Sequence, residues 1–151
     1  MKILRTPDEC FNNLEDYPFE PNYIDIEHNN HTLRMHYLDE NSESEEIVLL
    51  MHGEPTWSYL YRKIIPILVS NGKRVIAPDL IGFGKSDKPS SREDYSYANH
   101  IMWVETLIKK LDLKNIIFFA QDWGGLIGLR LLAKYPHLYE GLVVSNSGLP
   151  V

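Results

Sequence analysis

The sequence predicts an α/β fold: a mostly parallel sheet with helices on both faces, preceded by an antiparallel hairpin. Short apolar runs at 47–51, 75–77, 115–120 (after the polar Asn115) and 142–144 are typical of strands that are covered on both sides. Segments with helical spacing lie between these runs. Strands that alternate with helices indicate crossover connections, and therefore parallel pairing of the strands.

The hairpin is predicted near the N-terminus, where apolar and polar residues alternate. Residues 23–27 alternate with period two, residues 28–31 have the composition of a turn, and residues 33–38 alternate again. Residues 1–21 contain three prolines, so we expect an irregular arm ahead of the hairpin.

Three helices are predicted between the apolar runs. The first covers residues 58–70, with Pro66 expected to kink it or delay its start. The second carries apolar residues at helical spacing from 97 to 111, with Ser96 placed as its N-cap. The third, at 126–135, is apolar on nearly all sides, which suits a helix buried against a sheet.

The composition is that of one ordinary globular domain. The chain has 151 residues, of which 44% are hydrophobic and 24% are charged. Its 21 acidic and 15 basic residues give a formal charge of −6, so nucleic-acid binding is not expected. No apolar run approaches the ~20 residues of a membrane span, so no membrane association is predicted. The single cysteine, Cys10, indicates a reducing compartment, and we expect a cytoplasmic protein.

Three of the predicted strands end in motifs that carry reactive or flexible residues. The strand at 47–51 is followed by the first motif, His-Gly-Glu-Pro-Thr-Trp (52–57). The strand at 75–77 is followed by the second motif, Pro-Asp-Leu-Ile-Gly-Phe-Gly-Lys-Ser (78–86). The strand at 115–120 is followed by the third motif, Gln-Asp-Trp-Gly-Gly (121–125). Ligands of such sheets bind beyond the carboxyl ends of the strands, so these motifs are the candidates for a functional site.

The motif at 121–125 has the strand–sharp turn–helix form of a nucleophile elbow, with Asp122 at its tip. Such a turn is strained and its helix packs tightly on the strand, so small residues are needed around the nucleophile. Gly124 meets this requirement, whereas Ala120 stands where the pattern has glycine. An aspartate at a strand–helix junction could instead be an ordinary helix N-cap.

Taken together, the three motifs resemble those of haloalkane dehalogenases in the α/β-hydrolase superfamily. The narrow part of the resemblance is Glu-Pro-Thr-Trp (54–57) combined with Gln-Asp-Trp-Gly-Gly (121–125), because the other two segments occur across the superfamily. The resemblance covers most of residues 22–151. It implies an α/β-hydrolase core and the hydrolysis of haloalkanes to alcohol and halide through an aspartyl-alkyl ester.

The resemblance makes Asp122 the expected nucleophile. A carboxylate is normally ionised at neutral pH, so it can displace halide from an sp³ carbon without a base. The indole N–H of Trp123 is expected to bind the halide, because it can donate but not accept. The backbone N–H groups of Trp123 and Glu54 are expected to form the oxyanion hole when a histidine-activated water attacks the ester. The partners would be a small halogenated alkane and a halide ion, and no cofactor or metal is expected.

The other motif residues are expected to support the loops: His52, Gly53, Asp79, Gly82, Gly84, Gly124 and Gly125. Asp79 is expected to hold the loop at 82–84 through side-chain-to-backbone hydrogen bonds. The remaining histidines are interpreted as turn or surface residues without a role: His28, His31, His36, His100 and His137.

The resemblance also implies what this chain lacks. In the family a helical cap, two further strands, an acid and a histidine would follow, so we expect residues 1–151 to be the N-terminal part of a main domain, truncated after about the sixth strand and without a second domain. Such a chain is expected to be inactive alone and poorly soluble. Two alternatives stay open: an epoxide hydrolase, against which Glu54 and Gln121 argue, and a non-catalytic truncated remnant. The oligomeric state is not predicted.

Overall fold

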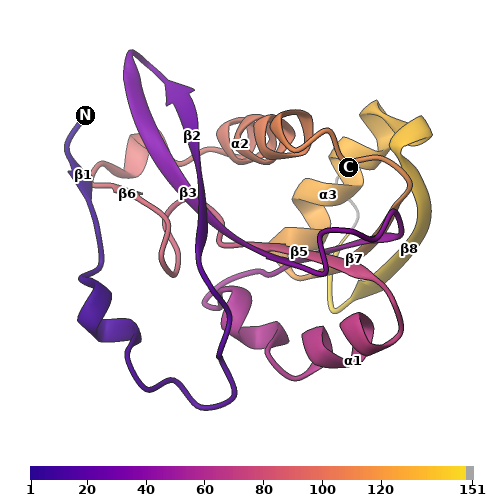
Figure 1. The fold of residues 1–151 in the computed structure, drawn as a ribbon. Coiled ribbons are helices and arrows are strands. Elements are labelled where there is room, and N and C mark those ends of the chain that lie inside the picture. Colours follow the sequence, from indigo (N-terminus) through magenta and orange to yellow (C-terminus); the bar gives the residue numbers. More distant parts are fainter. Residues whose placement is uncertain (149–151) are drawn as a thin grey trace.

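Six strands form one mixed sheet, and helices pack on both of its faces (Figure 1). The computed structural model describes residues 1–148. The strands, in sheet order, are β2 (Asn22–His28), β3 (His31–Glu40), β5 (Arg74–Pro78), β4 (Ile47–Met51), β7 (Ile116–Gln121) and β8 (Tyr139–Ser145). Pairing is antiparallel for β2–β3 and β3–β5, and parallel from β5 onward. The predicted fold class and the N-terminal hairpin are therefore confirmed.

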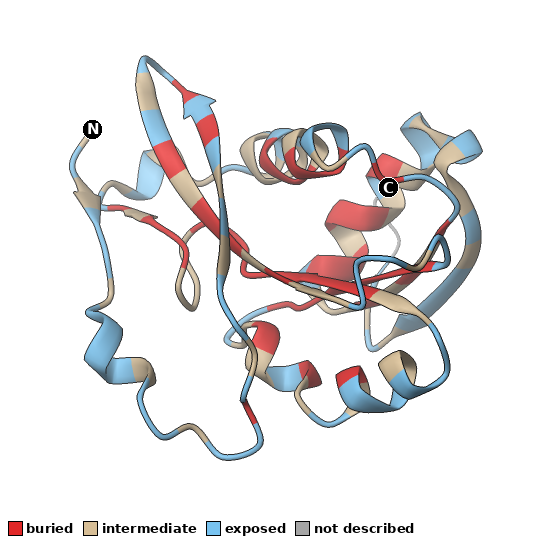
Figure 2. Ribbon diagram, in the orientation of Figure 1, coloured by how far each residue is buried: buried red, intermediate tan, exposed pale blue. Residues whose placement is uncertain are grey.

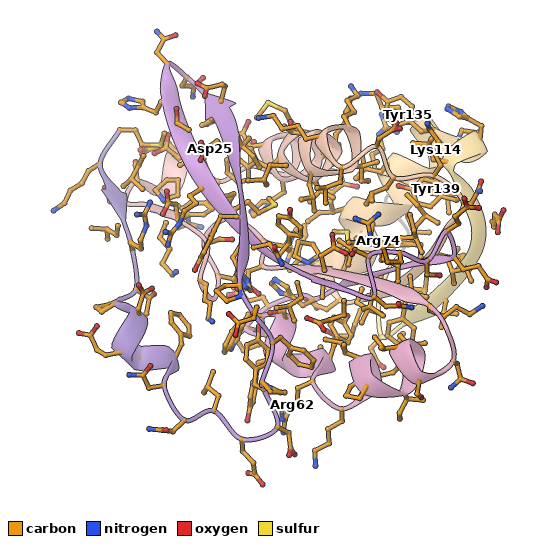
Figure 3. The ribbon with its side chains drawn as sticks, in the orientation of Figure 1. Asp25, Arg62, Arg74, Lys114, Tyr135 and Tyr139 are labelled. Carbon is orange, nitrogen blue, oxygen red and sulfur yellow. The ribbon has the colours of Figure 1, made fainter. Side chains whose placement is uncertain are left out.

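The β2–β3 hairpin forms because its apolar residues share one face at period two. Ile26 and Leu33 lie opposite each other in the register, and both are fully buried. The two asparagines of the turn have positive φ values of 48° and 59°, which asparagine tolerates better than most residues. Further along, Arg74 (labelled in Figure 3) ties β5 to β3 by donating to both carboxylate oxygens of Asp39, at 2.8 and 2.7 Å.

The central strands supply side chains to two separate cores, one on each face of the sheet. The helical segments that cover the sheet are η2 (Ser58–Tyr61), α1 (Ile64–Ser70), α2 (Tyr97–Lys110) and α3 (Trp123–Lys134). Val48 and Leu50 pack in the same cluster as Ile65 of α1. Leu49 and Met51 point the other way, into the cluster that α2 and α3 cover. This two-sided burial explains the continuous apolar run of β4.

The N-terminal arm is more ordered than its prolines suggested, so the prediction of an irregular arm is wrong in part. The short elements are β1 (Ile3–Leu4), η1 (Asp8–Phe11), β6 (Lys88–Pro89), η3 (Arg92–Asp94) and η4 (Pro136–Leu138). In the arm, β1 pairs with β6. Arg5 then donates to both carboxylate oxygens of the buried Asp87, at 2.7 and 3.0 Å. These contacts hold the arm against the loop that precedes α2.

The predicted helix at 58–70 is divided into η2 and α1. Pro66 is the third residue of α1, so its missing N–H falls in the first turn, where no intrahelical partner is needed. The predicted N-cap of α2 is confirmed, because Ser96 Oγ accepts from Asn99 N at 3.1 Å. Helix α3 begins at Trp123, earlier than the apolar pattern from residue 126 indicated.

Burial is uneven across the sheet (Figure 2). Every residue of β4 is buried, whereas no residue of the edge strand β8 is. Leu142, Val143 and Val144 are 44%, 47% and 40% exposed. Across residues 1–148, none of the helices combines the length and the apolar character needed to cross a membrane.

Candidate functional site

The carboxyl ends of β4 and β7 bring the first and third motifs together. These strands are parallel neighbours, and their register pairs Met51 with Ala120. The chain after each strand therefore emerges at the same edge of the sheet. A Cβ on Gly53 would lie 2.2 Å from Asp122 Oδ1, so only glycine leaves room for that side chain.

Asp122 occupies a sharp, strained turn between β7 and α3. Its φ of 54° and ψ of −127° place a non-glycine residue in a region that L-residues rarely adopt. Its carbonyl oxygen accepts from Gly125 N at 2.9 Å, from Leu126 N at 3.3 Å and from Ser147 Oγ at 2.8 Å. Its carboxylate does not cap the helix, although Asp122 occupies the N-cap position. The alternative that Asp122 is an ordinary N-cap, with its side chain bonded to the helix, is therefore wrong.

The carboxylate of Asp122 turns instead toward the first motif. Glu54 N donates to Asp122 Oδ1 at 2.9 Å, while the Glu54 side chain is exposed. Within the described part of the chain, the backbone N–H of Trp123 makes no hydrogen bond to this carboxylate. The Glu54 N–H, one of the two backbone donors predicted for an oxyanion hole, thus contacts the Asp122 carboxylate.

The first glycine after the elbow is demanded by packing. A Cβ on Gly124 would lie 2.3 Å from the backbone oxygen of Met51, and backbone cannot move away cheaply. Ala120, which replaces the glycine of the elbow pattern, is completely buried on β7 opposite Met51. Its methyl group is accommodated there without disturbing the β4–β7 pairing.

His52 links the first motif to the second. Its Nε2 accepts from Leu80 N at 2.9 Å, so the proton must reside on Nδ1, which then donates to Gly53 O at 2.8 Å. Burial lowers the pKa of His52, which favours this neutral form. Both ring nitrogens are occupied, and His52 is therefore a structural group in this geometry.

Asp79 organises the loop between β5 and β6 from a fully buried position. Its carboxylate accepts from Ser58 N, from Lys85 N and from His36 Nδ1, each at 2.8 Å. Burial alone would raise the pKa of Asp79, but the hydrogen bonds from His36 and from the Lys85 N–H stabilise the carboxylate and hold the pKa below its ordinary value.

The two loop glycines take backbone conformations that other residues avoid. Gly82 has a φ of 100° and Gly84 a φ of 47°. A Cβ on Gly84 would lie 2.2 Å from Asp79 Oδ2, so the loop wraps closely around that carboxylate.

The interpretation of His36 and His28 as turn or surface residues is wrong. His36 is completely buried, because the loop with Ser86 covers the outer face of β3 and Ser86 Oγ accepts from His36 N at 2.8 Å. His28 ends β2 but packs edge-on against the buried ring of Trp103, with ring centroids 5.2 Å apart. Neither burial could be read from the alternation of β2 and β3, because the covering groups come from distant segments.

A cavity of roughly 590 Å³ opens beside the elbow. It is lined by Gly53, Glu54, Leu80, Gly82, Phe83, Arg92, Tyr95, Ser96, Tyr97, His100, Trp123 and Ile127. Trp123 is 44% exposed, so its indole is available to a ligand. His100 was also expected to be a turn or surface residue, but it contributes to this wall, and burial lowers its pKa to about 4. Among residues 1–148 no cluster of three or more His, Cys, Asp or Glu side chains could hold a metal ion.

Comparison with known proteins shows the family to which the chain belongs. The family model for the alpha/beta hydrolase fold matches residues 46–150. A haloalkane dehalogenase from Psychrobacter cryohalolentis is 56% identical over 151 residues, which is 99% of this chain and 50% of that protein. One from Mycolicibacterium paratuberculosis is 54% identical over the same shares. The chain thus spans about half the length of the curated relatives it matches.

Solved structures show the same likeness. The tetrameric haloalkane dehalogenase DpaA from Paraglaciecola agarilytica NO2 superposes with a TM-score of 0.94 at 46% identity, over 99% of this chain and 50% of that one. A Vigna radiata epoxide hydrolase variant superposes less well, with a TM-score of 0.70 at 30% identity over 83% of this chain and 38% of that one. The chain therefore belongs to the α/β-hydrolase fold family, and within it the chain is haloalkane dehalogenase-like.

Proposed function

We propose that Asp122 displaces halide from a haloalkane and becomes an alkyl ester in doing so. The observation that carries this proposal is the hydrogen bond from Glu54 N to Asp122 Oδ1, at the edge of a cavity that Trp123 lines. Oδ1 is held by this bond, which leaves Oδ2 to attack. The Oδ2–carbon bond forms as the carbon–halogen bond breaks, and the electron pair leaves with the halide.

The same hydrogen bond prepares the hydrolytic step. After alkylation, Oδ1 is the carbonyl oxygen of the ester. Attack on that carbonyl moves negative charge onto Oδ1, where the Glu54 N–H already donates. The backbone N–H of Trp123 is proposed as the second donor to Oδ1. The Trp123 indole N–H is proposed to bind the leaving halide, since the charge that develops in the first step lies there.

The hydrolytic step also needs a base. His52 cannot supply one because both of its ring nitrogens are engaged. His100 lines the cavity, but its pKa of about 4 makes it a weak base. We therefore expect the 151-residue chain to stop at the ester. This separates the two half-reactions: alkylation depends on Asp122 and its surroundings, and turnover depends on a general base acting on water.

The test is carried out in a Cys10→Ser background, because the exposed thiol of Cys10 would itself be alkylated. This chain is incubated with 1,2-dibromoethane, and both intact mass and bromide are followed. We expect one alkyl adduct, mapped to the peptide that contains Asp122, and release of about one bromide per chain. Asp122→Ala should abolish both signals. Asp25→Ala, which removes an exposed carboxylate on β2 (labelled in Figure 3), should leave both unchanged.

Two results would contradict the proposal. An adduct that persists in Asp122→Ala would place the nucleophile elsewhere, and multiple turnovers by the purified chain would show that a base is present. A styrene oxide adduct in the absence of any bromoalkane adduct would favour an epoxide hydrolase instead.

A further inference from the structure

The peptide group between Gly53 and Glu54 is hydrogen-bonded at both its carbonyl oxygen and its N–H. Its N–H donates to Asp122 Oδ1, as described above. Its carbonyl oxygen, on Gly53, accepts three hydrogen bonds: from His52 Nδ1 at 2.8 Å, from Thr56 Oγ1 at 2.9 Å and from Thr56 N at 3.0 Å. A peptide group is planar, so fixing its C=O direction also fixes the direction of its N–H.

Two of these three donors come from Thr56. Its backbone N–H closes the turn that begins at Gly53, and its hydroxyl reaches the same oxygen. The third donor, His52, carries its proton on Nδ1 because the Leu80 N–H occupies Nε2. Of the groups that grip this carbonyl, only the Thr56 hydroxyl can be removed without disturbing the backbone or a buried ring.

We propose that Thr56 is a positioning residue for attack on the ester, because its hydroxyl holds the Gly53–Glu54 peptide so that the Glu54 N–H stays on Asp122 Oδ1. This inference rests on the proposed function. Donors on the carbonyl also polarise the peptide, which strengthens the bond that its N–H donates. Thr56 acts through that peptide and is not itself expected to touch the substrate.

The two half-reactions should respond differently to the loss of this hydroxyl. During alkylation, negative charge leaves the Asp122 carboxylate for the halide, so the bond from Glu54 N weakens as the reaction proceeds. During attack on the ester, charge builds up on Oδ1 and the bond strengthens. Loss of the hydroxyl should therefore slow attack on the ester and leave alkylation nearly unchanged.

Hydroxylamine allows the second step to be measured in this chain without a catalytic base. Its nitrogen lone pair attacks the ester carbonyl carbon, and the C=O pair moves onto Oδ1. Collapse expels the alkoxide, which takes up the proton that the nitrogen loses, and Asp122 becomes a hydroxamate. The experiment forms the ester with 1,2-dibromoethane in the Cys10→Ser background, removes excess reagent, adds hydroxylamine and follows the ester and the hydroxamate by intact mass.

Three variants give the comparison. Thr56→Val removes the hydroxyl at nearly constant shape, and Thr56→Ser retains it. Thr106→Val is the matched control, because Thr106 Oγ1 donates to the backbone oxygen of Met102 at 2.8 Å on the exposed side of α2. We expect Thr56→Val to slow hydroxylaminolysis roughly three- to tenfold, the effect of losing one ordinary hydrogen bond. Thr56→Ser should restore the rate, and Thr106→Val should not change it.

A second measurement does not depend on chemistry. The amide proton of Glu54 reports its bond to Asp122 by its chemical shift, which should move in Thr56→Val and be retained in Thr56→Ser. Equal hydroxylaminolysis rates and an unmoved amide shift in Thr56→Val overturn the inference. Equal slowing of both half-reactions, without rescue by serine, also overturns it. Absence of any adduct on Asp122 in the Cys10→Ser chain overturns the proposed function, and this inference with it.

Discussion

The strained backbone of Asp122 lowers the stability of the folded protein but sets the direction of its carboxylate. Its backbone conformation costs on the order of 1–3 kcal/mol in a non-glycine residue, and its carbonyl bonds to Gly125, Leu126 and Ser147 help to offset that cost. In this conformation the carboxylate makes no capping hydrogen bond to the helix and instead accepts a hydrogen bond from the Glu54 N–H. Strain of this kind persists where a site requires it.

Replacing Asp122 with glycine should therefore make the protein more stable while removing the carboxylate that we propose as the nucleophile. We expect Asp122→Gly to unfold at higher urea concentration, by about 1 kcal/mol, because glycine adopts the turn without strain. Asp25→Gly is the control: it lies within strand β2, where glycine should destabilise. A clear loss of stability in Asp122→Gly would mean that its hydrogen bond to Glu54 outweighs the strain.

His100 should make stability depend on pH in the mildly acidic range. Burial, with a smaller contribution from nearby His52, lowers its pKa to about 4, whereas the unfolded chain protonates histidine near 6.5. Between these values the unfolded state binds more protons, so stability is lost as the pH falls from about 6.5 to about 4. The slope for one such group approaches about 1.4 kcal/mol per pH unit.

Urea unfolding at several pH values in this window measures the effect. His100→Phe should flatten the slope, because phenylalanine does not titrate and fits beside Trp103, whose ring centroid lies 4.9 Å from that of His100. An identical slope in the two proteins would rule out His100 as a contributor. A proton NMR titration of His100 should give a midpoint near the same low pH.

At the scale of elements, the sequence predicted the strands and most helices but not what the loops bury. Continuous apolar runs identified β4 and β5 because these strands are buried on both faces. The runs also located β7 and β8, although the expected burial is wrong for β8, none of whose residues is buried. The start of α3 at Trp123 was less clear, since its first turn is two glycines rather than an apolar stripe. The pairing of β1 with β6 joins residues far apart in the chain, and no local pattern encodes it.

The site shows the same division. The elbow was predictable because a strand, a tight turn and a helix follow one another in the chain. The buried pair of His36 and Asp79 was only half predictable: Asp79 lies in a motif, but His36 reaches it from β3. Thr56 lies within the first motif, but its role could not be predicted, because it depends on the carbonyl oxygen of Gly53 that its hydroxyl contacts. Local chemistry was readable from the sequence, whereas contacts between segments required the fold.

The close packing of α3 on β4 should make Gly124 intolerant of a methyl group. Alanine normally stabilises a helix by about 1 kcal/mol relative to glycine. Here its Cβ would meet the Met51 oxygen at 2.3 Å, so Gly124→Ala should cost about 3 kcal/mol or prevent folding. Gly141→Ala is the matched control, because its nearest neighbouring atom is 3.7 Å away. Urea unfolding compares them, and equal stability of the two variants would contradict the packing argument.

At the scale of the whole molecule, β8 presents an apolar edge to solvent. Val143 and its two neighbours are each at least 40% exposed, and unpaired strand edges of this kind promote association. We expect light scattering by the purified chain to rise with concentration, and Val143→Lys to suppress the rise. Ile67→Lys on α1 is the control, because Ile67 is 60% exposed but lies on a helix. If it suppresses scattering equally, the edge is not the cause.

Because β4 and β7 are neighbours, the contact between Glu54 and Asp122 and the shape of the cavity wall depend on different parts of the chain. The two could therefore be altered independently. Glu54 and Asp122 lie 68 positions apart in the chain, yet their contact depends on a ladder of only a few rungs. Much of the cavity wall, including Arg92, Tyr95 and His100, comes from the intervening segment and takes no part in that ladder. Insertions or grafts at 90–96 should therefore change which molecules enter the cavity while leaving the Glu54–Asp122 contact in place.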